Sequence, residues 1–134
     1  MSFAPYMLMS AGPEVVFHVF RFQINGTSDP DFQMPAGAVV DVVRQDAGDF
    51  DIEYKEKFPV LLGVMGSVME ATPEHDLQVK ADLADYDAST GVLSISIVGA
   101  DGTPIDEDPA DDDWVFVVAA FGKRNIFFET AGAL

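Results

Sequence analysis

Short stretches in which apolar and polar residues alternate with a period of two constrain this chain more than any other feature. Residues 49–55 read Asp-Phe-Asp-Ile-Glu-Tyr-Lys, so every second side chain is apolar. Such a period gives a β-strand one buried and one wet face, whereas a helix needs a period near 3.6. Turn residues at 46–48 precede this segment and a further apolar stretch lies before them, which predicts a β-hairpin.

The same pattern recurs along the chain, with turn-forming residues between the segments. Strands are predicted at 14–24, 38–45, 49–55, 60–69, 77–83, 93–97 and 114–121, and 125–129 is either a last edge strand or part of a tail. Residues 25–37 read as a turn-rich loop. The sequence therefore predicts an all-β protein: a single-domain β-sandwich or jelly roll of about seven to eight antiparallel strands over residues 14–134, preceded by an N-terminal arm at 1–13.

Two of these segments are almost entirely apolar. Residues 114–121 suit a central strand that is covered on both faces, with Trp114 as an anchor in the core. Residues 60–69 contain Gly63 and Gly66, which disfavour a helix and favour a buried strand with a bulge at one of the two glycines.

Charge and composition limit the classes of partner. The 134 residues carry a net charge of −16, which repels both the phosphates of nucleic acids and anionic lipid. A protein partner should therefore offer neutral or positive patches. The chain has no cysteine for disulfides or thiol chemistry, and no apolar run reaches the ~20 residues that span a bilayer. No signal peptide is recognisable at the start, which favours synthesis in a bacterial cytoplasm.

Catalytic chemistry has little support in the sequence. The only histidines are His18, in a strand pattern, and His75, in a turn, so a zinc site lacks ligands and His18 is best read as a structural residue. No nucleophile elbow, phosphate loop or dinucleotide fingerprint occurs. Acids such as Asp49, Asp51 and Glu53 fall on the wet face of one strand. We therefore expect a protein that binds a partner, with no catalytic residues and no cofactor.

One acidic run leaves two interpretations open. Residues 106–113 hold six acids among eight residues, and this density of oxygen ligands suits Ca²⁺. The run lacks the spacing of an EF-hand loop, and a solvated loop is the simpler interpretation. The candidate metal ligands are Asp106, Asp108, Asp111 and Asp112.

Two terminal segments are the candidates for binding a partner. The apolar arm at 1–13 either lies on a partner surface or folds back on its own domain. The adjacent basic residues at 123–124 follow the last long apolar segment. The candidate partner-binding residues are Phe3, Tyr6, Met7, Leu8, Met9, Lys123 and Arg124.

A family resemblance adds to this interpretation. The stretch Val-Val-Arg-Gln-Asp-Ala-Gly-Asp-Phe-Asp-Ile-Glu-Tyr at 42–54, followed by Phe-Pro-Val-Leu-Leu at 58–62, resembles small phage virion proteins. The apolar segment that ends near 123–125 also fits them. Among such proteins, decoration (cement) proteins of tailed-phage capsids are closest in size. Trimeric C1q-like and tail-fibre head domains share a comparable hairpin.

The resemblance implies a jelly-roll homotrimer on the capsid outer surface, bound to the major capsid protein, with no catalytic residues. We therefore expect a capsid decoration protein. The main alternative is a receptor-binding or fibre-tip domain that recognises a host glycan or protein. A cellular binding module, another virion part such as a tail-tube or neck protein, and an unrecognised enzyme also stay open.

Overall fold

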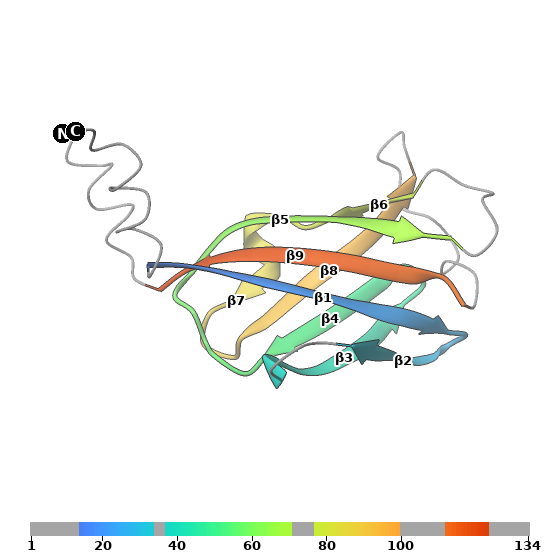
Figure 1. Cartoon of the computed structure of the whole chain (residues 1–134), viewed down its shortest axis with the longest axis horizontal. Coiled ribbons are helices and arrows are strands. Elements are labelled where there is room, and N and C mark those ends of the chain that lie inside the picture. The colour runs from blue at the N-terminus through green and yellow to red at the C-terminus, as the bar shows by residue number, and fades with distance from the viewer. Residues whose placement is uncertain (1–13, 34–36, 71–76, 100–111, 124–134) are drawn as a thin grey trace.

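The computed structural model describes residues 14–33, 37–70, 77–99 and 112–123, and these residues form an antiparallel all-β fold (Figure 1). The strands are β1 (Val15–Asn25), β2 (Ser28–Gln33), β3 (Val39–Asp46), β4 (Asp49–Tyr54), β5 (Val60–Met69), β6 (Leu77–Lys80), β7 (Tyr86–Asp87), β8 (Val92–Gly99) and β9 (Trp114–Gly122). One 3₁₀ turn, η3, spans Leu83–Asp85. The predicted all-β antiparallel domain is confirmed.

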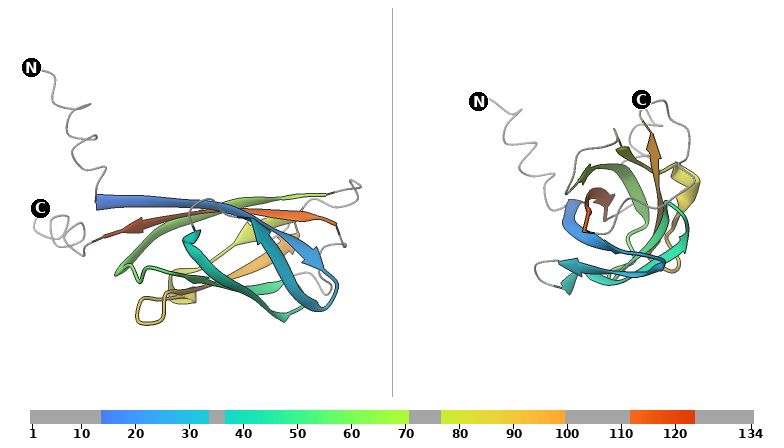
Figure 2. Two further views of the ribbon diagram at one scale, coloured as in Figure 1. Left: turned by 60° about the horizontal axis from the view of Figure 1, so that its bottom comes forward. Right: turned by 90° about the vertical axis from the view of Figure 1, so that its right-hand side faces the viewer.

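The strands join into one continuous sheet that curls on itself. Their order is β2-β1-β9-β5-β6-β8-β4-β3, with β7 paired to the start of β8. Seen along its length, the sheet encloses a nearly closed barrel whose seam lies between β2 and β3 (Figure 2). At this seam the carboxylate of Asp29 accepts a hydrogen bond from the backbone N–H of Arg44 at 2.9 Å. A side chain thus links two strands that no backbone ladder joins.

The core follows largely from the period-two patterns, because the longer strands turn most of their alternate side chains inward. The buried apolar residues contributed by the strands are Phe20, Phe22, Ile24, Val39, Val42, Phe50, Ile52, Tyr54, Val60, Leu61, Leu93, Ile95, Ile97, Val98, Val115, Val117, Ala119 and Phe121. Full burial of one such aliphatic or Phe side chain contributes about 1.5–3 kcal/mol. The barrel interior is therefore filled with side chains and holds the fold together.

Several local predictions were wrong or incomplete. The expected loop at 25–37 contains β2, which pairs with β1 although it includes Pro30; an edge strand tolerates a proline because one of its sides needs no ladder. The strand expected at 77–83 ends at Lys80 and gives way to η3. The expected bulge in β5 is confirmed, since the register with β9 shifts between Leu61 and Gly63. The expected burial of this strand was wrong, because beyond Leu61 its residues are half-buried or exposed.

The strand β9 also differs from its prediction. It lies centrally, between β1 and β5, but only its inward side chains are buried. Trp114 is half-buried on the outer face, where the guanidinium carbon of Arg21 lies 4.0 Å from its ring centroid. The expectation that Trp114 anchors the core was therefore wrong. A continuous apolar run does not reveal whether a second layer covers its outer face.

Candidate interaction surface

Both described chain ends emerge at the same end of the barrel. The first residue of β1, Val15, pairs with the last residue of β9, Gly122. Just beyond them, the backbone N–H of Lys123 donates a hydrogen bond of 2.8 Å to the carbonyl oxygen of Glu14. Lys123 is exposed there. The segments that the sequence analysis singled out, 1–13 and 123–124, are thus attached to neighbouring points although they lie at opposite ends of the sequence.

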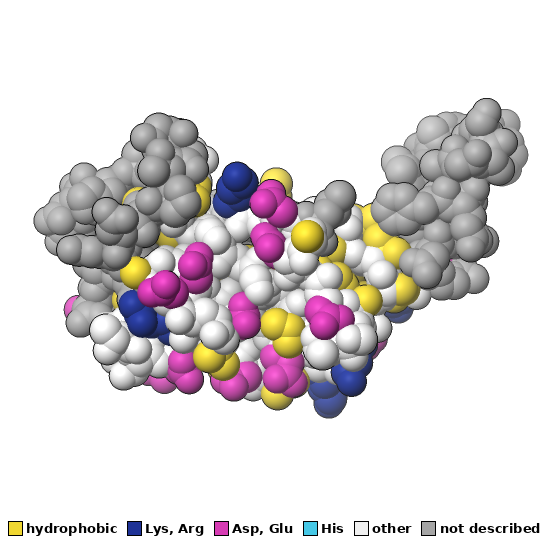
Figure 3. All heavy atoms as spheres, turned by 180° about the vertical axis from the view of Figure 1, so that it is seen from behind, with side chains coloured by type: hydrophobic (Ala, Val, Ile, Leu, Met, Phe, Trp, Pro, Cys, Tyr) yellow, Lys and Arg dark blue, Asp and Glu magenta, His cyan; other side chains and the backbone are white. Residues whose placement is uncertain are grey.

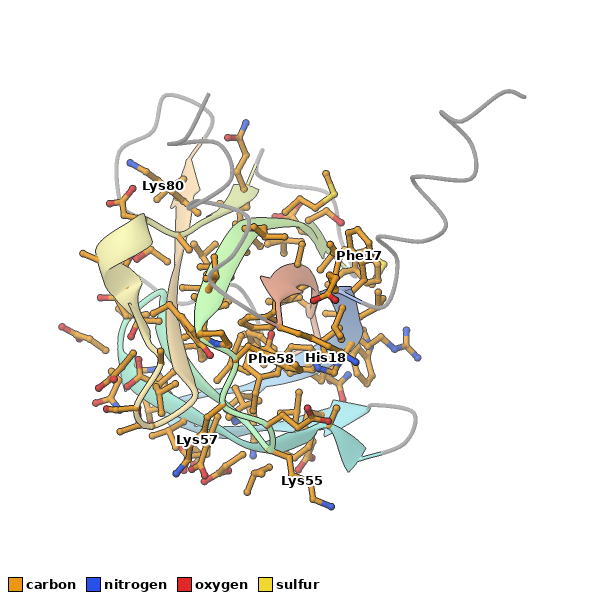
Figure 4. All side chains as sticks on the ribbon, turned by 90° about the vertical axis from the view of Figure 1, so that its left-hand side faces the viewer. Phe17, His18, Lys55, Lys57, Phe58 and Lys80 are labelled. Carbon is orange, nitrogen blue, oxygen red and sulfur yellow. The ribbon has the colours of Figure 1, made fainter. Side chains whose placement is uncertain are left out.

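Aromatic side chains close this end of the barrel from the inside (Figure 4). His18 lies on the inward-facing side of β1, with its ring centroid 5.5 Å from those of both Tyr54 and Phe58. Burial lowers the pKa of His18, which keeps the ring neutral at physiological pH. The structure agrees with the interpretation of His18 as a packed structural residue. Lys55 and Lys57 follow the last residue of β4, and their side chains lie at the rim of the barrel in the end-on view of Figure 4.

An apolar outer face extends from this end along β1, β9 and β5. The register aligns four rows across the three strands, and the side chains in these rows point away from the core. The rows are Phe17–Ala120–Gly63, Val19–Val118–Met65, Arg21–Phe116–Ser67 and Gln23–Trp114–Met69. None of these twelve positions is acidic, and the single charge belongs to Arg21. We call these twelve residues the β1-β9-β5 face.

This face exposes large apolar side chains to an unusual degree. Phe17 and Met65 are 66% and 67% exposed, and Val19 and Met69 are each 43% exposed. Single exposed apolar residues are ordinary, but a contiguous apolar patch on a soluble domain marks a contact surface. Sequence reasoning missed this face, because Phe17 and Val19 lie in a strand pattern and were not separated from the core. The signal was the weak alternation at 15–20, where the outward positions are as apolar as the inward ones.

The opposite side of the barrel is acidic (Figure 3). On β4, Asp49 and Asp51 accept hydrogen bonds from the hydroxyls of Ser96 and Ser94 on β8, at 2.9 and 2.6 Å. These acids lie on the outer face, as the alternation of 49–55 predicted. The acids of β4 thus lie away from the β1-β9-β5 face, which carries no acid of its own.

The remaining candidate residues lie mostly outside the described ranges. Those are Phe3, Tyr6, Met7, Leu8, Met9 and Arg124 among the partner-binding candidates and Asp106, Asp108 and Asp111 among the metal candidates. Asp112 is described and exposed, with a positive φ of 70°. The next residue, Asp113, is buried, and its carbonyl oxygen accepts a hydrogen bond from the N–H of Ile24 at 3.0 Å. Within the described ranges, no three His, Cys, Asp or Glu side chains group as metal ligands would.

Comparison of the chain with protein-family models, with curated proteins and with solved structures finds no match in any of the three. Among residues 14–33, 37–70, 77–99 and 112–123, no helix has the length and apolar character needed to cross a membrane.

Proposed function

We propose that this protein is a structural virion component: a capsid decoration (cement) protein that binds the outer surface of a phage head and stabilises contacts between major capsid subunits. It acts by binding and not by catalysis. One observation carries the proposal. The points at which the two terminal segments with partner-binding candidates are attached lie side by side, linked by the hydrogen bond between Lys123 and Glu14.

The composition of these segments suits attachment to a protein surface. Residues 1–13 contain no charged side chain, although 22% of the whole chain is charged. Fully extended, they reach about 43 Å, which is enough to contact a neighbouring subunit. An uncharged arm can bind a neutral groove on the partner without bringing the acids of the barrel close to it.

The acidic side of the barrel complements this arrangement. When the terminal end is bound to the shell, the carboxylates of β4 can stay in water, where they keep an abundant surface protein soluble. Many copies on one lattice would each need only modest affinity if every copy contacts two capsid subunits, because the second contact forms at high effective concentration.

The proposal is tested by co-sedimentation with empty capsids. The parent chain should bind at many copies per particle. Deleting residues 1–13 should weaken binding at least roughly tenfold, and K123E/R124E should weaken it by a smaller factor, as expected for charges at the rim of an interface. Lys80, an exposed lysine on β6 outside this end, supplies the matched control K80E.

Two results would contradict the proposal. One is a deletion variant that retains its fold, judged by circular dichroism, and binds capsids as well as the parent chain does. The other is a protein present at few copies per particle that binds host cells, which would favour the receptor-binding or fibre-tip alternative.

A further inference from the structure

The first half of β1 has a strand neighbour on one side only. Pairing with β9 runs from Val15 to Gln23, whereas pairing with β2 begins at Arg21. Residues 15–20 therefore form an edge toward which no strand of the described part is paired. The views in Figure 2 show this half of β1 extending past the end of β2.

Two hydrogen bonds define which backbone groups point out of this edge. The carbonyl oxygen of Glu14 accepts from Lys123, and the N–H of Ile24 donates to Asp113, so both groups point to the side of β9. Backbone groups of successive residues in an antiparallel strand point to opposite sides. The N–H and C=O groups of Val15, Phe17 and Val19 therefore point away from β9, toward the open side.

The other edge of the sheet, β3, is protected against pairing with another chain, whereas the open edge of β1 is not. On β3 the N–H of Val42 donates to the carboxylate of Asp41, and the N–H of Arg44 donates to Asp29. The neighbouring β2 contains Pro30. Carboxylates and proline are common means of preventing an edge strand from pairing with another chain. The β1 edge reads Val-Val-Phe-His-Val-Phe, with no proline and no Asp, Glu, Lys or Arg.

From these observations we infer that a second copy of this chain pairs with the open edge of β1, antiparallel, through residues 15–20. Phe17 lies opposite its counterpart on a two-fold axis, and Val15 lies opposite Val19. Each of the three facing pairs exchanges two backbone hydrogen bonds, about six in total. The outward Phe17 and Val19 side chains of both copies then pack together at the border of the β1-β9-β5 faces.

Charge favours a second copy as the occupant. Two chains of net charge −16 repel each other, so they can approach closely only where acids are lacking, and the edge at 15–20 has none. A pairing of six residues from each copy is a short contact, at the small end of specific interfaces. Because the acids of β4 lie on the other side of the barrel, salt at 0.15 M, with a Debye length of about 8 Å, screens them from the partner copy.

The stoichiometry differs from the one that the family resemblance implies. An edge-to-edge contact with a two-fold axis uses the same surface on both copies and is complete with two. The resemblance implies trimers. The mass in solution therefore decides between them, and it does so without reference to capsid binding, so this inference and the proposed function can fail separately.

The first experiment measures the mass of the full chain over a wide range of concentration, by sedimentation or light scattering. We expect two chains of 14.5 kDa to associate, and more tightly as salt is raised. The double variant F17K/V19K should weaken association at least roughly tenfold, since it places like charges opposite each other. The matched control is M65K/M69K, because Met65 and Met69 are as exposed as Phe17 and Val19 but lie on β5. The control should dimerise as the parent does.

The second experiment uses the absence of cysteine from the chain. F17C introduces a single thiol on the proposed axis, where facing Cα atoms of a hydrogen-bonded pair are about 5.5 Å apart and within disulfide range. Mild oxidation should cross-link F17C rapidly and M65C slowly.

Four results would overturn the inference. They are a parent chain that stays monomeric at every concentration, a trimer, equal loss of association in M65K/M69K, and equal cross-linking of F17C and M65C. A monomer that dimerises only after residues 1–13 are deleted would show that the chain's own N-terminal segment occupies the edge.

Discussion

The hydroxyl of Tyr54 offers a sharp test of how the barrel interior is stabilised. The Tyr54 side chain is 1% exposed, and its hydroxyl has no hydrogen-bond partner among the described residues. Its ring packs edge-on against Phe121, with the centroids 4.9 Å apart. Tyr86 is a natural control, because its hydroxyl donates a 2.6 Å hydrogen bond to the carbonyl oxygen of Phe58.

Replacing Tyr54 with phenylalanine keeps the ring and removes the unpaired polar group. A buried polar group without a partner costs about 1–3 kcal/mol, so Y54F should raise the free energy of unfolding by about 1 kcal/mol. In a domain of this size that gain corresponds to a rise in Tm of roughly 3–5 °C. Y86F should have the opposite sign and lose about 0.5–1.5 kcal/mol, because it leaves the carbonyl oxygen of Phe58 without its donor.

Urea denaturation followed by tryptophan fluorescence measures both changes, since Trp114 is the only tryptophan. The midpoints should move in opposite directions while the slope m stays constant, which is the sign of a change in stability alone. If Y54F proves less stable than the parent chain, or if both variants shift the same way, the hydroxyl of Tyr54 has a partner in solution and this reasoning is wrong.

The burial of Tyr54 also makes the free energy of unfolding depend on pH. Burial raises the pKa of Tyr54 above its ordinary value of 10, so the folded protein holds this proton more tightly than the unfolded chain does. The contribution of protonated Tyr54 to the free energy of unfolding is fully present below pH 10 and is lost as the pH rises above it. In Y54F the alkaline loss of stability should be smaller, as the unfolding midpoint between pH 9 and 11 would show.

The remaining predictions concern His18, the two glycines of β5, and Asp29 at the seam between β2 and β3. Burial lowers the pKa of His18 below its ordinary value of 6.5, so the folded protein binds this proton less readily than the unfolded chain does. The free energy of unfolding should therefore decrease as the pH falls below 6.5. H18F should make this decrease smaller in thermal melts at pH 5–7. G66A should cost at least roughly 2 kcal/mol, because its Cβ would overlap the carbonyl oxygen of Phe116, whereas G63A meets open space and should change the urea midpoint little. D29A should cost only about 0.5–1.5 kcal/mol but increase aggregation in light scattering, because it removes a carboxylate that caps the β3 edge; unchanged scattering would contradict the edge-protection argument.

The sequence alone determined the class of fold. The period-two alternation at 49–55 and its repetition elsewhere predicted antiparallel strands and a core that includes Phe50, Ile52 and Tyr54, because strand geometry requires alternate side chains to face the same way. The bulge in β5 followed from its glycines. The position of the β4 acids on the outer face of the sheet followed from the same alternation.

Only the tertiary structure decided which apolar surfaces remain uncovered. Residues 114–121 read as a strand buried on both faces, yet nothing in the described part covers the outer face of β9, so Trp114 lies under Arg21 and not in the core. The juxtaposition of Glu14 and Lys123 and the open edge at 15–20 also depend on strand order. Local alternation specifies a strand but does not specify its neighbours, because the partners of a strand are set by contacts between residues far apart in the chain.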